Sequence, residues 1–145
     1  MRHRMAVAVL ALLGLLASAY LLLYKLGVVG SLACGGSGAC ERVQTSPYAQ
    51  FLGVPVAAYG VAGFAALLAV ALAGLRERWV DRATPSRALA AMAGVGVLFA
   101  AYLTYLEIAV IHDICRWCAF CALLITAILV VSLLGTRSVN RPPSR

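Results

Sequence analysis

The chain has 145 residues, of which 63% are hydrophobic and only 12% are charged. This composition excludes an ordinary soluble globular domain and is typical of a polytopic membrane protein. The formal net charge of +7 does not indicate a nucleic-acid partner, because the basic residues gather at the ends of the apolar segments.

Four apolar segments are each close to the roughly 20 residues that a helix needs to cross a bilayer. They cover residues 5–24, 54–75, 88–111 and 117–134. The sequence therefore predicts an all-α, integral membrane four-helix bundle over residues 5–134. Residues 1–4 and 135–145 are then tails, and the basic, proline-containing segment after Gly135 is expected to be disordered.

The first apolar segment also resembles a signal peptide. Arg2-His3-Arg4 precedes it, and Ala17-Ser18-Ala19 imitates a cleavage site. Because apolar residues continue through Leu23, beyond the cleavage site, we favour an uncleaved first span.

The basic residues predict the orientation of the four spans. Nine of the twelve Lys and Arg residues lie before the first span, between the second and third, or after the fourth. The positive-inside rule then places both termini and the 76–87 loop in the cytoplasm. The four cysteines at positions 34, 40, 115 and 118 fall on the opposite face, which in a bacterial inner (cell) membrane meets the oxidising periplasm. Besides membrane lipid, any partner of these cysteines is therefore expected outside the cytoplasm.

The first outer loop contains Cys34-Gly-Gly-Ser-Gly-Ala-Cys40. The glycines free the backbone, so this loop can close on a disulfide and can also move. Mobility favours a disulfide that exchanges, although a purely structural disulfide is the alternative. Downstream, Ser46 and Pro47 are typical of a helix start, which predicts a short surface half-helix over residues 47–52, ended by Gly53.

Small residues such as Gly60 in the second span and Gly96 in the third predict close helix packing. Glu107 is the only charged residue within the predicted spans. Because it lies near the outer boundary, it can simply reach water. The alternatives are a proton relay or a partner for Arg116.

The fourth span begins with a Cys-x-x-Cys pair. Asp113 is expected as the helix N-cap, which places Cys115 in the first turn and Cys118 in the next, on one side of the helix. The helix N-terminus and Arg116 favour a thiolate there, whereas Asp113 opposes it. The pair is therefore a candidate redox-active dithiol. Cys121 is expected to be a small packing residue.

Two cysteine pairs on one face suggest a thiol–disulfide relay. The loop pair can meet a soluble protein dithiol, and the membrane pair can meet an acceptor dissolved in lipid. The natural two-electron acceptor there is a quinone, ubiquinone or menaquinone, bound in an apolar pocket of the bundle.

The chain resembles the vitamin K epoxide reductase (VKOR) family in its bacterial four-span form. The resemblance is carried by Cys34 and Cys40 in a small-residue loop, Val43, Ser46, Tyr48-Ala49, Gly53-x-Pro55, Gly60, Tyr102-Leu103 and Cys115-Arg-Trp-Cys118. It implies a quinone-dependent protein dithiol oxidase that supports disulfide formation. It also implies a separate periplasmic thioredoxin-fold (DsbA-like) partner, because we expect no fused thioredoxin-like domain in a chain of this length.

The resemblance also implies roles for individual residues. Cys34 pairs with Cys40 and faces the soluble partner, Cys115 exchanges with Cys40, and Cys118 faces the quinone, with Ser46 in support. The implied quinone pocket comprises Val56, Tyr59, Leu103, Cys118 and Ala122. Animal members carry an Asn and a Tyr that hydrogen-bond the quinone where this chain has Val56 and Ala122. This departure disfavours the alternative function, vitamin K quinone/epoxide reduction.

Three other readings are less favoured. A DsbB-type enzyme performs the same chemistry, but its Cys-x-x-Cys pair lies early in the chain. A small tetraspan transporter using Glu107 would not need the cysteines. A metal or iron–sulfur site at Cys115-x-x-Cys118-x-x-Cys121 lacks a fourth nearby ligand, so no metal is expected.

Overall fold

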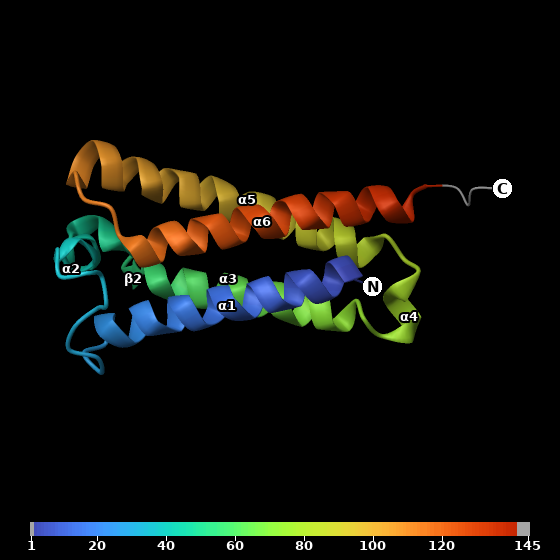
Figure 1. Cartoon of the computed structure of the whole chain (residues 1–145), viewed down its shortest axis with the longest axis horizontal. Coiled ribbons are helices and arrows are strands. Elements are labelled where there is room, and N and C mark those ends of the chain that lie inside the picture. The colour runs from blue at the N-terminus through green and yellow to red at the C-terminus, as the bar shows by residue number, and fades with distance from the viewer. Residues whose placement is uncertain (1, 142–145) are drawn as a thin grey trace.

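The computed structural model describes residues 2–141 and shows a bundle of four long helices (Figure 1). These are α1 (Arg2–Lys25), α3 (Val56–Ala73), α5 (Thr84–Leu106) and α6 (Arg116–Val139). Each is long and apolar enough to cross a membrane. The predicted four-helix membrane bundle is therefore confirmed.

The two ends of the bundle differ in their connections (Figure 1). One end holds the N-terminus, the end of α6 and the short helix α4 (Glu77–Val80). The other end holds α2 (Ala39–Thr45), the 3-10 turn η1 (Pro47–Ala49) and a hairpin of β1 (Gln50–Phe51) and β2 (Val54–Pro55). All elements that connect α1 to α3 therefore lie at the end where α6 begins.

The bundle core is built from small and branched side chains. One buried cluster includes Val7, Phe64, Leu89 and Ile128, one from each long helix. Many large apolar side chains on the outer surface are exposed in the isolated protein, as expected for helices that face lipid. Glycines allow two of the close approaches. A Cβ at Gly60 would collide with Ser18 of α1, and one at Gly96 would collide with Ile125 of α6.

The ends of the helices differ from the predicted spans. α1 begins at Arg2, and Arg4 is buried, donating hydrogen bonds to the backbone carbonyls of Gly74, Trp79 and Arg82. Arg4, which the sequence predicts to set the orientation in the membrane, therefore also binds α1 to the connection between α3 and α5. α6 continues to Val139, so the first part of the expected disordered tail is helical, and residues 142–145 lie outside the described part of the chain.

The segment predicted as a half-helix is more complex than expected. A single turn, η1, replaces the expected helix over residues 47–52, and the chain then reverses through Leu52 and Gly53, whose φ angles are 53° and 78°. Positive φ at both positions is the geometry of a two-residue hairpin loop. Phe51 then packs edge-on against Tyr59 of α3 and Phe99 of α5, which attaches the hairpin to the bundle.

Candidate active site

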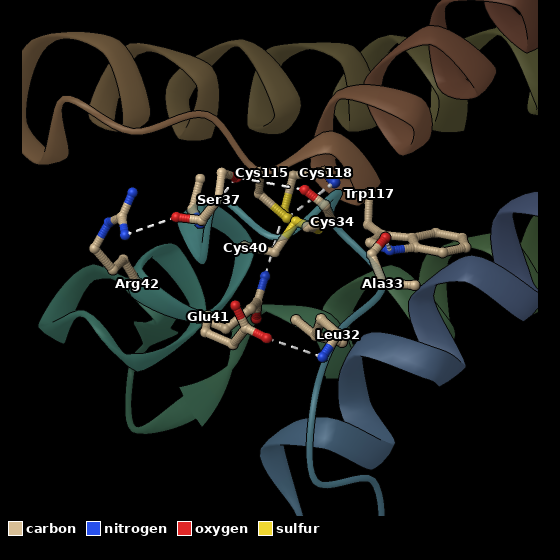
Figure 2. The surroundings of a disulfide bond; sticks show 12 residues. Leu32, Ala33, Cys34, Ser37, Cys40, Glu41, Arg42, Cys115, Trp117 and Cys118 are labelled. Carbon is tan, nitrogen blue, oxygen red and sulfur yellow. Dashed lines mark hydrogen bonds between the residues drawn. A yellow bond between two sulfur atoms is a disulfide. The ribbon is translucent and has the colours of Figure 1, made fainter.

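The loop after α1 is closed by a disulfide between Cys34 and Cys40 (Figure 2). Their Cα atoms are 6.1 Å apart, within the usual range for a disulfide. Gly35, Gly36 and Gly38 have φ angles of 72°, 79° and 68°, a region that residues with a Cβ rarely adopt. The glycines therefore allow the short loop to close. Only 3% of Cys34 and none of Cys40 is exposed.

Three hydrogen bonds hold the disulfide loop in place, and Figure 2 labels the residues that make the first two. The Glu41 carboxylate accepts from the Leu32 N–H at 3.0 Å, and the Trp117 indole N–H donates to the Ala33 carbonyl at 3.2 Å. Lys25 at the end of α1 donates to the Gln44 carbonyl at 2.9 Å. The loop is thus fastened to both α1 and α6.

A fourth contact is an ion pair between α2 and the segment that precedes α6. The Arg42 guanidinium donates to both carboxylate oxygens of Asp113, at 2.7 and 2.9 Å. The hydrogen bond from Arg42 lowers the pKa of Asp113, and the same bond raises the pKa of Arg42. This pair joins α2, which carries Cys40, to the segment that leads into Cys115.

The start of α6 differs from the prediction. Cys115, not Asp113, is the N-cap, and its sulfur accepts from the Cys118 backbone N–H at 3.4 Å. Asp113 cannot cap the helix because its carboxylate is bound to Arg42. Hydrogen bonding by the Cys118 side chain lowers the pKa of Cys115, and the Cys118 backbone N–H acts in the same direction, whereas burial opposes both. A lowered pKa makes the Cys115 sulfur a good leaving group in thiol–disulfide exchange.

The two cysteine pairs meet at one end of the bundle (Figure 2). Cys34, Cys40 and Cys115 belong to one buried cluster, and Cys118 packs against it. Cys115 and Cys118 are thiols here, while the loop pair is oxidised. The structure therefore brings together the four cysteines named from the sequence, in an arrangement suited to passing a disulfide from one pair to the other.

A cavity of about 400 Å³ opens beside Cys118. Its wall is mainly apolar and comes from all four long helices, with Gln44 of α2 at the cysteine end. The five residues named from the sequence for a quinone pocket all line it: Val56, Tyr59, Leu103, Cys118 and Ala122. An apolar space of this size with a few polar groups at one end fits the ring of a quinone.

The family model of the vitamin K epoxide reductase family matches residues 5–133 of the chain. The chain belongs to this family. The protein is therefore a membrane-bound redox enzyme of the VKOR type. VKOR enzymes in general act with quinones and thioredoxin-like proteins.

Gln44 is a feature of this VKOR enzyme that the sequence reasoning missed. It lies one helical turn after Cys40 in α2 and is only 6% exposed. Its side-chain amide donates to the sulfur of Cys118 at 3.3 Å. A helix starting at Ala39 would have predicted that Gln44 lies on the same face as Cys40, but no helix was expected there.

Ser46, predicted to support the site, makes a hydrogen bond within its own segment. Its hydroxyl donates to the Val43 carbonyl at 2.8 Å. It lines a second, smaller cavity that also contains Gln44, Glu107 and Cys118 in its wall. Ser46 therefore shares a cavity wall with Cys118, and its supporting role stays a prediction.

Glu107 and Cys121 also contribute to the main cavity. Glu107 is 6% exposed, so the expectation that it reaches water is wrong. Its carboxylate accepts from the Cys115 backbone N–H at 3.1 Å. Arg116 is exposed, approaches Gly35, and forms no salt bridge with Glu107 in the described part of the chain. Cys121 packs against the bundle core and lies 3.8 Å from the Ser18 hydroxyl, consistent with a packing residue that also borders the cavity.

Proposed function

We propose that this VKOR enzyme is a quinone-dependent protein dithiol oxidase. It would pass electrons from a thioredoxin-fold protein through the two cysteine pairs to a membrane quinone. The observation that carries the proposal is the position of Cys118, which contacts the buried cluster of the other three cysteines and also lines the apolar cavity.

The first transfer begins at the loop pair. A thiolate of the partner attacks Cys34, and the partner leaves oxidised once its second thiol has displaced Cys34, so the loop pair becomes a dithiol. Because Cys34 is 3% exposed, this step requires the loop to open, and its glycines supply the freedom to do so. Two electrons have then entered the loop pair.

The second transfer takes place between the pairs. Cys40 attacks the sulfur of Cys115 in an oxidised Cys115–Cys118 pair, and Cys34 then attacks Cys40 and releases Cys115. The result is an oxidised loop pair and a reduced membrane pair, which is the state of the structure. A bound quinone supplies the capacity for two electrons and two protons. Cys118 faces the cavity, and its reoxidation with Cys115 completes the cycle.

The distribution of charge supports a location in a bacterial inner membrane with both termini in the cytoplasm. The N-terminus, α4 and the end of α6 lie at the end of the bundle opposite to α2 (Figure 1). The basic 76–87 loop contains α4, Arg2 begins α1, and Arg137 and Arg141 lie at the end of α6 and just after it. By the positive-inside rule that end is cytoplasmic. The cysteines would then face the periplasm, where a dithiol oxidase is needed.

The test is anaerobic mixing of the purified protein with a reduced thioredoxin-fold protein and a quinone, while quinol is measured. We expect catalytic quinol formation. Cys34→Ser should abolish turnover with the protein partner but retain turnover with a small dithiol that reduces the Cys115–Cys118 pair directly. Cys118→Ser should abolish both. No quinol from the wild-type protein with either reductant, or full activity of Cys118→Ser, would refute the proposal.

A further inference from the structure

Glu107 is the one charged residue that lines either cavity in the described part of the chain. It is 6% exposed. Cys118 also lines both cavities, so Glu107 lies at the end of the main cavity that is next to the cysteines. Its carboxylate accepts from the backbone N–H of Cys115. The side chain therefore borders both the dithiol and the space where an acceptor would bind.

The position of Glu107 is fixed by an irregular end of α5. Residues Glu107–Ile111 form a π-helical turn (η2), and His112 follows with a φ of 61°. The Glu107 carbonyl accepts from the Asp113 N–H at 3.1 Å while its carboxylate accepts from Cys115. Wide turns of this kind occur frequently at functional sites. The backbone carbonyl and the side-chain carboxylate of Glu107 are thus both hydrogen-bonded to the segment that carries Cys115.

No cation neutralises this carboxylate within residues 2–141, where the one salt bridge is Arg42–Asp113. A buried carboxyl group without a cation is costly in a membrane protein and is typical of a proton pathway. The titratable groups facing the same cavities are two tyrosines and the thiols of α6. They are Tyr48 of η1, Tyr59 of α3, Cys118 and Cys121. Among the described residues that line these cavities, Glu107 is the only one with a carboxyl group.

We propose that Glu107 carries protons from the Cys115–Cys118 dithiol to the quinone. This inference rests on the proposed function. Oxidation of the dithiol breaks two S–H bonds and forms one S–S bond, and two electrons pass to the quinone. Reduction of the quinone to quinol forms two O–H bonds. Glu107 accepts a proton from a thiol as a carboxylate, delivers it to a quinone oxygen as a carboxylic acid, and returns to its starting state.

Two substitutions separate proton transfer from a structural role. Glu107→Gln keeps a carbonyl oxygen for the Cys115 N–H but cannot take up and release a proton, whereas Glu107→Ala loses both properties. Positioned acid–base groups contribute typically about 10²–10⁴-fold. We therefore expect Glu107→Gln to slow quinol formation by about 100-fold or more. In the same variant, the thioredoxin-fold partner should reduce the Cys34–Cys40 disulfide at the wild-type rate.

A second measurement needs no quinone. The infrared difference spectrum between the protein with Cys115 and Cys118 oxidised and reduced should contain a carboxyl band that disappears in Glu107→Gln. Asp113→Asn is the matched control, because Asp113 is also close to Cys115 but is bound to Arg42 outside the cavity. The band should persist in this control.

The outcomes are distinct. Wild-type rates in Glu107→Gln with losses only in Glu107→Ala would show that the hydrogen bond to Cys115 is all that matters and would overturn the inference. A carboxyl band unaffected by Glu107→Gln would also overturn it. If the wild-type protein forms no quinol, the proposed function fails. The infrared band then decides separately whether Glu107 exchanges a proton with the dithiol.

Discussion

Gly63 offers a direct way to fill the cavity without disturbing the helices. It lies in α3 and lines the 400 Å³ space, yet a Cβ built on it meets nothing within 4 Å. A leucine there would extend into the cavity. The neighbouring Gly60 would not serve, because its Cβ would collide with Ser18.

The expected effect on quinone binding follows from the space lost. The four carbon atoms of a leucine side chain would displace about as many carbon atoms of a bound quinone. At about 0.8 kcal/mol for each buried carbon, the loss is about 3 kcal/mol, or about two orders of magnitude in affinity. The fold should not suffer, because replacing a helical glycine gains up to about 1 kcal/mol in helix propensity.

The assay is quinol formation as a function of quinone concentration, with a small dithiol as the reductant. We expect Gly63→Leu to raise KM for quinone by about 100-fold. Gly94→Leu is the matched control, since Gly94 also has no atom within 4 Å of a built Cβ but lies in α5 outside the cavity wall. An unchanged KM in Gly63→Leu would mean that quinone does not bind in this cavity.

Two further predictions concern α2. Gln44→Leu removes the amide donor to Cys118 but keeps a side chain of similar size. We expect quinol formation to slow by about 2–10-fold, which corresponds to the free energy of one hydrogen bond. An unchanged rate in stopped-flow measurements would contradict this. The second prediction concerns the ion pair between Arg42 and Asp113, in which Arg42 lowers the pKa of Asp113 in the folded protein. The pair therefore stabilises the fold fully at a pH above the carboxyl pKa of the unfolded chain, about 3.9. This stabilisation is lost as the pH falls through the lower pKa that Asp113 has in the folded protein. The difference in unfolding temperature between the wild type and Arg42→Gln should therefore shrink below about pH 4, and a difference that is constant from about pH 2 to 7 would refute it.

Hydropathy and cysteine spacing were enough to predict the bundle and its four clustered cysteines. Long apolar segments have one stable solution in a bilayer, which is a helix, because every backbone group must be hydrogen-bonded internally. The outer ends of α1 and α6 then had to lie on the same side, which placed the loop pair near Cys115 and Cys118. These inferences depend on the bilayer and on connectivity, so they did not require knowledge of side-chain contacts.

The errors fall where tertiary contacts decide the local structure. A seven-residue helix such as α2 is too short to be stable alone, and here the disulfide at Cys40 and the contacts of Glu41 and Arg42 hold it. Asp113 has the sequence of a good N-cap, but Arg42, 71 residues away in the chain, binds its carboxylate. The burial of Glu107 depends on the π-helical turn and on Cys115, which no local pattern indicates.

The helix α2 is bonded to both cysteine pairs. Cys40 and Gln44 are four residues apart, so they lie one turn apart on the same face of α2. Cys40 is bonded to Cys34, while the Gln44 amide is bonded to the sulfur of Cys118 at the cavity. A displacement of α2 as a whole would shift Cys40 and Gln44 together.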